Sequence, residues 1–600
     1  MIHRKRLAAF LAVGLAAGIL SPAFSEAAKK VKAITQPPGA KASAARQTAC
    51  KKKGYAKYGF KNQGQCIAYG ATATPATATP APAATQAPAT QAPAAAAPVA
   101  TVGKKGGKVI MAVGAESNGW LPATQNWASE GSQVSISVIE RLMAFDDKGQ
   151  PSPWLLKSMT PNGSYTEWRM TVRDGIKFHN GEPLNADAVA QNIASVRKGF
   201  ITANVFLNLG ECNVESEMVL ICKTKKPWVS LPVYFTGATG AIVAPAQIKA
   251  NDATKPIGTG PFVFKEWIPN VKFVATKNPN YWQKGLPVAD EIEFRVLLSD
   301  DARLAQIQSG QVDYIQTNTA VAVAEYEKLA KAQKVKAYVN EGATAINYDL
   351  LNNAIPPFSN RDCRLAAAQA LDIDTLIKLR APVNTKATGP FAKGVIGYVA
   401  DPGYPKYDLD AAKASFEKCK AAGPAFTAFT MATTTSPEAI ETRNIKKQMV
   451  ERAGFSIKTV EIPQDQYIPA ALTGAFQWQT WRLFGAPDPD GERIWLASET
   501  AIPAPGIALN FGRVKDGNID AALDQIRGSS DPVVRQRAAE IITTSYASEV
   551  YAIWNWNSKY LIAACNSCSG IEDARNPDGS KPQLNQGGVF NGLAYLTGKQ

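Results

Sequence analysis

Few side chains of this sequence are placed to act as acids, bases or nucleophiles. Of the two histidines, His3 falls within an N-terminal leader, so any catalytic triad or zinc site would have to use His179. The patterns G-x-S-x-G, H-E-x-x-H and G-x-x-x-x-G-K do not occur in the chain. Carboxylate chemistry of the kind that cleaves glycosides stays open, but no pair of acidic residues is singled out. We therefore expect neither an enzyme nor a cofactor.

Eight cysteines are the other reactive side chains, and in an exported chain they favour disulfides. Proximity in the sequence suggests the pairs Cys50–Cys66, Cys212–Cys222, Cys363–Cys419 and Cys565–Cys568. The second pair would close a hairpin whose return strand is 219–221, and the third would join two predicted helices. The C-N-S-C spacing of the last pair could also serve redox or metal chemistry. Metal sites normally need four ligands, however, and only His179 is left to join these cysteines, so we expect a disulfide.

The first 28 residues are typical of a secretory signal peptide. Residues 4–6 are basic, residues 7–20 are apolar, and small residues near 25–27 offer a cleavage site. The apolar run is too short to span a membrane comfortably, and no later stretch reaches about 18 uncharged apolar residues. No cysteine directly follows the run, so a lipid anchor is not indicated. The sequence predicts a soluble protein exported to the periplasm.

The net charge of +15 belongs to the N-terminal part of the chain. Residues 1–105 hold 15 of the 65 Lys and Arg but one of the 50 Asp and Glu, which leaves 50 basic and 49 acidic side chains in 106–600. The large body therefore carries no basic footprint for nucleic acid. The lysine-rich, Cys-bounded segment 29–70 could contact an anionic envelope surface or could be a basic spacer. Residues 71–105, rich in Ala, Pro and Thr, predict a disordered, extended linker.

From Gly106 onward the sequence alternates between strand and helix patterns. Residues 108–113 predict a strand, and 132–143 predict a helix with apolar side chains at Val134, Val138 and Leu142. The same alternation continues to the end of the chain, which predicts an α/β fold with mixed sheets.

Residues 171–190 form the most distinctive block of the body. A strand ends at the turn Arg173-Asp174-Gly175, and a capped helix follows the segment K-F-H-N-G. Asn185 is a suitable N-cap because its side-chain oxygen can accept a hydrogen bond from the first helical turn. Val189, Ile193 and Val196 recur at helical spacing and predict one buried face.

Several blocks appear in a fixed order along the body. They are F-D-D through P-W-L at 145–155, the block 171–190, P-I-G-T-G-P-F at 256–262, N-P-x-Y-W at 278–282, and N-Y followed by P-P-F and R-L-A at 347–366. This ordered set resembles the extracellular solute-binding proteins of family 5, the peptide, opine and nickel class, which deliver ligands to ABC importers. The resemblance covers about residues 106–600. Asp362 stands where the family often has Arg, so no ligand role is transferred to that position.

The resemblance implies a two-lobed periplasmic-binding-protein fold with an additional subdomain. Lobe one would hold 106–345 and 560–600, and lobe two would hold 346–559. The ligand would be enclosed between the lobes of a monomer, and the closed form would be recognised by the membrane permease. In the family's signature the position of His179 lies in a solvent-facing turn outside the ligand site, so we expect it to be structural.

The family's ligand contacts fall on three segments of this sequence. The candidate contacts are Glu116, Trp120 and Trp127, then Asn347 and Tyr348, then Trp481, Asp488 and Asp490. Asp488 or Asp490 would pair with a ligand amine, and Trp481 would provide an aromatic platform. Alternatively, the aspartates only shape a proline-containing turn and the tryptophans belong to the core. A peptide is the expected ligand, since the scarcity of histidine argues against direct ligation of nickel or haem.

A second interpretation concerns the basic N-terminal segment. Together with the long linker, it is compatible with an envelope-attached scaffold or adhesin. Removal of 29–100 distinguishes the two interpretations, because ligand capture would survive the deletion whereas adhesion would be lost.

Overall fold

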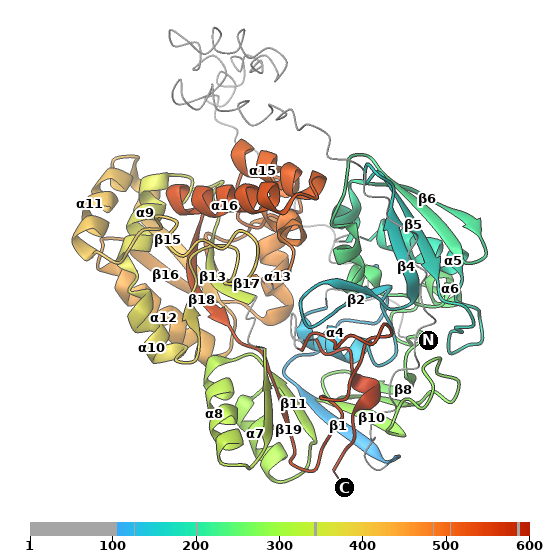
Figure 1. The fold of residues 1–600 in the computed structure, drawn as a ribbon. Helices are drawn as coiled ribbons and strands as arrows, with labels where there is room; N and C mark the ends of the chain where they lie inside the picture. Colours follow the sequence, from blue (N-terminus) through green and yellow to red (C-terminus); the bar gives the residue numbers. More distant parts are fainter. Residues whose placement is uncertain are drawn as a thin grey trace, which may run out of the picture. The chain divides into compact units, whose positions relative to one another are not determined.

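The structure is a computed structural model, shown in Figure 1. It describes residues 105–124, 127–199, 202–340, 345–483, 485–503, 506–584 and 589–599. The expected signal peptide, the Cys-bounded segment with Cys50 and Cys66, and nearly all of the linker lie outside these residues. Among the described residues, no helix combines the length and the apolar character needed to cross a membrane.

Lobe one is built on a mixed sheet, which has seven strands in the described part of the chain, in the order β12-β19-β11-β1-β10-β9-β8. The strands are β1 (Lys108–Val113), β8 (Phe262–Ile268), β9 (Lys272–Lys277), β10 (Glu291–Val296), β11 (Tyr314–Thr317), β12 (Lys336–Val339) and β19 (Leu561–Ala564). Central β1 runs parallel to β10 and β11, whereas the outer pairs are antiparallel. The predicted strand 108–113 is therefore confirmed.

Both faces of this sheet are covered, as the alternation of side chains along β1 requires. Val109, Met111 and Val113 belong to the cluster on the side of α4 (Ser129–Ser135). Ala112 belongs to the opposite cluster, on the side of α7 (Asp300–Gln308) and α8 (Ala320–Lys331). The sheet is thus buried on both sides and can act as a rigid base for one lobe.

The predicted helix over 132–143 is wrong in its extent. Helix α4 ends at Ser135, and the next residues run as a buried turn toward β2 (Met143–Phe145). The carbonyls of Ser137 and Val138 accept hydrogen bonds from Phe262 and Gly260 instead of from a following helical turn. Tertiary pairing with the loop around Gly260 therefore replaced the helix that the apolar spacing favoured.

A subdomain with its own core is inserted between β1 and β8. It contains the strands β3 (Pro151–Pro153), β4 (Leu156–Pro161), β5 (Glu167–Val172), β6 (Leu209–Ser216) and β7 (Val219–Thr224), and the helices α5 (Ala186–Val196) and α6 (Pro245–Ala250). The side chain of Asn185 accepts a hydrogen bond from the Ala188 N–H at 2.9 Å, and Val189, Ile193 and Val196 are buried. The capped helix predicted from the sequence is confirmed.

Lobe two is built on a second mixed sheet, in the order β14-β18-β13-β17-β15-β16 among the described residues. The strands are β13 (Ala345–Leu351), β14 (Thr385–Lys386), β15 (Ala428–Thr433), β16 (Ser456–Glu461), β17 (Trp478–Leu483) and β18 (Ala552–Ser558). One face packs against α9 (Arg361–Ala370), α10 (Ile373–Arg380), α11 (Leu409–Lys420) and α12 (Pro437–Glu451). The other face packs against α13 (Gln464–Thr473), α15 (Gly517–Gly528) and α16 (Pro532–Glu549).

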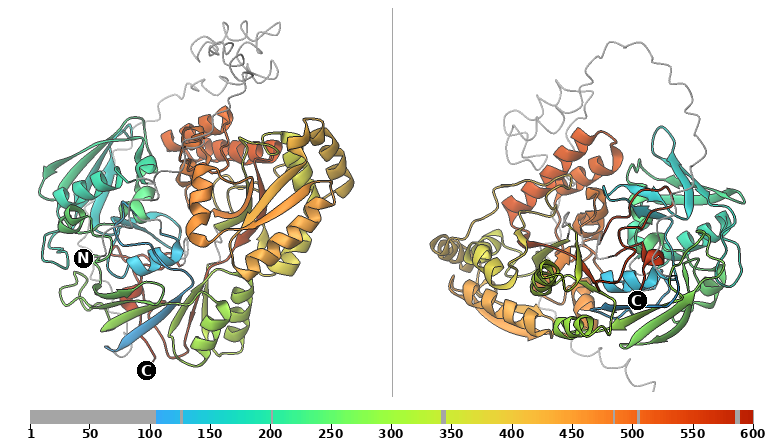
Figure 2. Two further views of the ribbon diagram at one scale, coloured as in Figure 1. Left: turned by 180° about the vertical axis from the view of Figure 1, so that it is seen from behind. Right: turned by 60° about the horizontal axis from the view of Figure 1, so that its bottom comes forward.

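Along the sequence, the chain changes from the first sheet to the second between β12 and β13 and returns between β18 and β19. We call these the crossing segments; Figure 2 shows the two lobes from two further sides. Each lobe thus has its own core and its own helices. The expected α/β fold with two lobes and mixed sheets is confirmed.

Three disulfides join the cysteines in the expected pairs among the described residues. Cys212–Cys222 links β6 to β7, Cys363–Cys419 links α9 to α11, and Cys565–Cys568 closes the turn after β19. The last two sulfurs lie near the carboxylate of Asp313, but they are bonded to each other and offer no thiolates to a metal.

Candidate functional site

Glu140, a residue that the sequence reasoning did not identify, links several of the recurring sequence blocks. Its carboxylate is 1% exposed and accepts hydrogen bonds from Trp154 Nε1 at 2.8 Å and from the Tyr281 hydroxyl at 2.7 Å. Thr259 and Trp282 donate to it as well, at 2.8 and 3.0 Å. Burial raises the pKa of Glu140, although these donors oppose the rise. The blocks P-W-L, G-T-G-P-F and N-P-x-Y-W therefore meet at one carboxylate and hold lobe one together.

His179 supports the same region. Its Nε2 lies 3.0 Å from the Gly260 carbonyl, and its backbone N–H donates to the Gly258 carbonyl at 2.9 Å. A Cβ at Gly258 would lie 1.9 Å from the Val138 carbonyl, so glycine is required for this close approach. Burial lowers the pKa of His179 to about 4, which keeps the ring neutral at pH 7. The side chain is turned inward rather than toward solvent, and its role is structural.

The three candidate contacts between Glu116 and Trp127 lie in the packed part of lobe one. Glu116 accepts hydrogen bonds from backbone N–H groups of its own loop and of the turn after β8. Trp120 is 1% exposed and packs edge-on against Trp267, with ring centroids 5.4 Å apart. Trp127 donates its indole N–H to the Gly119 carbonyl at 2.8 Å. These contacts match the alternative in which the tryptophans belong to the core.

Asn347, Tyr348 and Trp481 lie together in the sheet of lobe two. The register of β13 and β17 places Tyr348 directly opposite Trp481. Tyr348 packs on Trp554 of β18 with centroids 5.3 Å apart, and Trp481 stacks on a tyrosine of α13 at 5.7 Å. The side-chain oxygen of Asn347 accepts a hydrogen bond from Asn555 at 2.9 Å. The structure therefore brings these three candidates next to each other, near the first crossing segment.

Asp488 and Asp490 lie after β17, at the start of the short helix η8 (Pro489–Glu492), but they have different partners. Asp488 caps this helix through the Asp490 N–H at 2.9 Å, and it forms an ion pair with Arg535 of α16. Asp490 is fully buried and forms an ion pair with Arg527 of α15 at 2.9 Å. Both carboxylates are thus already occupied by arginines of lobe two.

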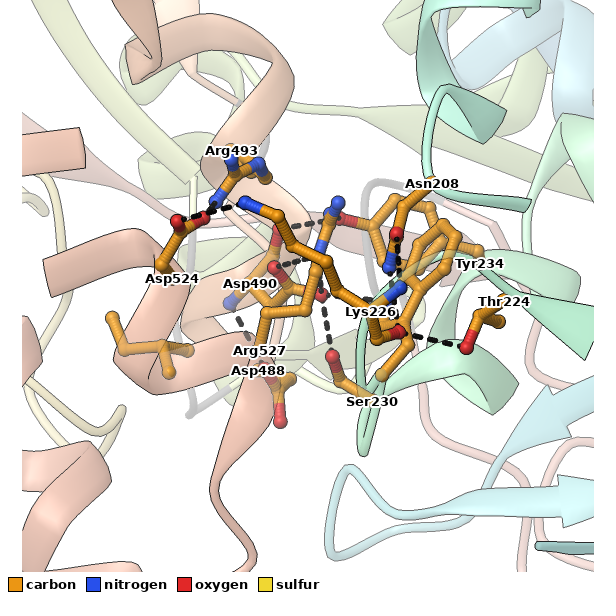
Figure 3. A network of polar contacts seen from close by, with 12 residues as sticks. Asn208, Thr224, Lys226, Ser230, Tyr234, Asp488, Asp490, Arg493, Asp524 and Arg527 are labelled. Atoms are coloured by element: carbon orange, nitrogen blue, oxygen red, sulfur yellow. Dashed lines mark hydrogen bonds and ion pairs between the residues drawn. The ribbon is translucent and has the colours of Figure 1, made fainter. Parts of the chain in front are cut away.

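Asp490 also contacts residues of the inserted subdomain, as Figure 3 shows. Trp228 Nε1 donates to its carboxylate at 2.9 Å, and the Ser230 hydroxyl donates to the same oxygen. The Tyr234 hydroxyl donates to the Asp490 carbonyl and accepts from Arg527 at 2.8 Å. We call these five residues the interlobe clasp, because Trp228, Ser230 and Tyr234 come from one lobe and Asp490 and Arg527 from the other.

The charges of the clasp are mutually stabilising. The guanidinium of Arg527 lies 4.2 Å above the centroid of the Trp228 ring. Burial disfavours its positive charge, but the carboxylate of Asp490 more than offsets this effect and raises the pKa of Arg527. An exposed ion pair between Lys226 and Asp524, at 3.3 Å, lies beside the clasp and also joins the two lobes (Figure 3). The lobes are therefore held together by a buried polar contact away from the crossing segments.

Comparison with known proteins agrees with this architecture. A model of the bacterial extracellular solute-binding proteins, family 5, matches residues 150–503. The nickel-binding periplasmic protein of Escherichia coli K12 is 28% identical over 255 residues, which are 40% of this chain and 47% of that protein. The glutathione-binding protein GsiB of Salmonella typhi is 26% identical over 324 residues, 52% of this chain and 61% of that protein. The chain thus aligns with about half of the length of these relatives.

Solved structures match over a larger part of the chain. The binding protein AgaA from A. tumefaciens R10, in complex with agropinic acid, aligns with a TM-score of 0.72 at 19% identity and covers 82% of this chain and 99% of its own. DppA from Helicobacter pylori, in complex with the peptide STSA, aligns with a TM-score of 0.72 at 17% identity and covers 83% and 99%. At these identities the likeness concerns the fold.

Proposed function

Because the chain belongs to the bacterial extracellular solute-binding proteins of family 5, we propose that it captures a small ligand, in the first instance a peptide, for an ABC importer. The signal-like residues 1–28 support export to the periplasm, where the loaded protein would meet the membrane permease. The names of the relatives, which include binders of glutathione, peptides and nickel, support a small and polar ligand.

The observation that carries this proposal is the two-lobed architecture with a polar contact between the lobes. The chain changes lobe between β12 and β13 and again between β18 and β19, and the interlobe clasp joins the lobes elsewhere. A rotation about the crossing segments would expose the clasp to water and admit a ligand between the lobes. A ligand that contacts both lobes would favour the closed form, which is the mechanism of closure by population shift.

The clasp also changes the roles that we assign to the two aspartates. The carboxylate of Asp490 already has a cationic partner and two further donors, so a ligand amine would have to displace Arg527. We assign Asp490 to closure and Asp488 to the shaping of its loop. Asn347, Tyr348 and Trp481 remain the proposed ligand contacts of lobe two, since they lie beside a crossing segment.

The proposal is tested by native mass spectrometry of the full exported protein, purified from periplasm without refolding. The expected result is a discrete small-molecule adduct that is lost on collisional activation and whose mass identifies the ligand class. The same preparation, freed of ligand, is then tested for thermal stabilisation by the dipeptide Met-Leu, the peptide STSA, glutathione, agropinic acid and a nickel–histidine complex. A protein that carries no adduct and responds to none of these probes would contradict the proposal.

A further inference from the structure

Arg482 occupies an unusual position at the junction of the lobes. It lies on β17, one residue before the strand ends, and its register partner on β13 is Asn347. Asn347 in turn lies opposite Trp556 of β18. Strands β13 and β18 are the two that continue into the crossing segments, so Arg482 is placed at the edge of lobe two that faces those segments.

The guanidinium of Arg482 lacks the partners that other buried cations of lobe two have. Lys446 contacts Asp349 at 2.7 Å, and Arg527 contacts Asp490 at 2.9 Å. Among the residues that the structure describes, Arg482 forms no ion pair, and its buried Nε–H has no hydrogen-bond partner. A buried N–H donor without an acceptor is costly, so the Nε–H of Arg482 can gain from an acceptor that the described structure does not supply.

Polar groups of lobe one and of the second crossing segment lie at the same place. Tyr560 is fully buried on that segment, and its backbone carbonyl accepts a hydrogen bond from Asn340 at 3.0 Å. Arg482 and Ser129 lie close enough to its hydroxyl to act on it, but among the described residues the hydroxyl has no hydrogen-bond partner. Burial raises the pKa of Tyr560 to about 12, while the charge of Arg482 lowers it. The hydroxyl therefore stays protonated and able to donate.

Gln316 of β11 completes the group from the side of lobe one. Its amide is 2% exposed, and within the described structure neither its nitrogen nor its oxygen has a hydrogen-bond partner. Gln316 lies opposite Ile562 of β19, and Ile562 is two residues after Tyr560. Side chains two residues apart in an extended segment share a face, and Ile562 lies in the core on the side of α4. Gln316 and Tyr560 therefore point to the same side of lobe one.

We propose that Arg482, Tyr560 and Gln316 form a subsite for a carboxylate group of the ligand. This inference rests on the proposed function, because it assigns a chemical group to the ligand captured between the lobes. The guanidinium fork of Arg482 would bind both carboxylate oxygens, and the hydroxyl of Tyr560 and the amide N–H of Gln316 would donate to them. Because Arg482 belongs to lobe two and Gln316 to lobe one, a carboxylate bound here would favour closure.

One residue of lobe one offers an alternative partner for Arg482. Glu130 of α4 lies close enough to Tyr560 for its charge to act on the phenol, and it accepts a hydrogen bond from Asn318 at 3.4 Å. It is not within ion-pair distance of Arg482 among the described contacts. A direct pair between Arg482 and Glu130 would satisfy both charges without a ligand, so the test must separate the two cases.

The test combines a change in the ligand with a change in the protein. Binding of Met-Leu and STSA, and of the same peptides with C-terminal amides, is measured by calorimetry on the full chain and on the variants Arg482→Gln and Arg482→Met. The wild type is expected to prefer the free acid by about 10–100-fold, as a charge-assisted bidentate contact would give. Both variants are expected to bind acid and amide with nearly equal affinity. Arg537→Gln, which removes an exposed arginine of α16, is the matched control and is expected to retain the preference.

The outcomes are distinguishable. A wild type that binds none of the peptides or amides contradicts the proposed peptide function and this subsite together. A wild type that binds them, with an acid-to-amide ratio that is unchanged in Arg482→Gln and Arg482→Met, contradicts the subsite alone. Arg482→Gln is also made in the background of Glu130→Gln. If the loss of affinity caused by Arg482→Gln disappears in that background, and is the same for peptide acids and amides, Arg482 forms an interlobe ion pair with Glu130 and the subsite is wrong. Melting temperatures of all variants show whether each is folded.

Discussion

His179 illustrates at the residue scale how burial decides the role of a reactive side chain. In the sequence, His179 is the one histidine outside the expected leader and thus the sole candidate for histidine chemistry. In the fold its ring supports the Gly260 carbonyl, and the surrounding protein keeps it neutral. A base or metal ligand would need a free, accessible nitrogen, whereas the Nδ1 of His179 is buried without a partner among the described residues.

We predict that protonation of His179 destabilises the protein in acid. Its pKa is about 4 in the fold against 6.5 in the unfolded chain, so the unfolded state takes up a proton that the folded state refuses. The stability from the neutral ring is complete above pH 6.5 and is lost as the pH falls toward 4. His179→Gln keeps a side-chain donor for the Gly260 carbonyl but does not titrate. The difference in unfolding free energy between wild type and variant should change by on the order of 2 kcal/mol between pH 7 and pH 4.

Urea titrations at several pH values measure this difference, and the values above pH 7 provide the offset that does not depend on titration. Parallel pH profiles of the two proteins would show that His179 does not titrate as expected.

Two of the disulfides link elements of different lobes to their neighbours within the same lobe. Cys212–Cys222 closes a hairpin in the inserted subdomain over 10 residues, and Cys363–Cys419 joins two helices of lobe two over 56 residues. A disulfide limits the freedom of the unfolded chain, and the effect grows with the length of the closed loop.

We predict that removal of the longer link costs more. Chain entropy gives about 4 kcal/mol for Cys363→Ala with Cys419→Ala, against about 3 kcal/mol for Cys212→Ala with Cys222→Ala. Urea unfolding of both double variants, followed by circular dichroism, measures the loss in each lobe. The reverse order would show that packing around the sulfurs, rather than loop length, determines their contribution.

The interlobe clasp belongs to the scale of the whole molecule, because it joins segments about 260 residues apart in the sequence. Its polar groups are satisfied in the closed arrangement, whereas in an open one they would be satisfied by water. The net contribution of each hydrogen bond is therefore small, but loss of a partner in the closed form leaves a buried group unpaired.

We predict that Ser230→Ala combined with Tyr234→Phe shifts the protein toward the open form. The double variant removes two hydroxyls that contact Asp490 and Arg527 without changing the volume of the core. Small-angle scattering of the ligand-free full chain should give a larger radius of gyration than wild type, and peptide affinity should fall about tenfold. Lys226→Gln, which removes the exposed neighbouring ion pair, is the control and should change neither quantity. Unchanged scattering and affinity in the double variant would mean that the clasp does not regulate closure.

Local patterns in the sequence were sufficient to predict those elements that depend on interactions between residues close together in the chain. The capped helix α5 and the strand β1 were predicted from local spacing, and the three described disulfides join the pairs that proximity in the sequence suggested. The ordered blocks predicted the family and the fold, although they did not reveal that three of them meet at Glu140. Glu140 belongs to none of those blocks, and its structural role is evident only from the four hydrogen-bond donors that other segments supply.

The sequence by itself was sufficient to identify the family and the two-lobed α/β fold, because the family is recognised by blocks that occur in a fixed order. The tertiary structure decided which polar residues pair with one another between the lobes and which remain available to a ligand. Asp490 was a candidate ligand contact because of its acidic side chain and its position in the sequence, yet Arg527 pairs with it in the clasp. Arg482 lies on β17 opposite Asn347, and within the described part of the chain its buried Nε–H has no hydrogen-bond partner. The physical reason is that a charge is defined by its partners, and those partners come from parts of the chain hundreds of residues apart.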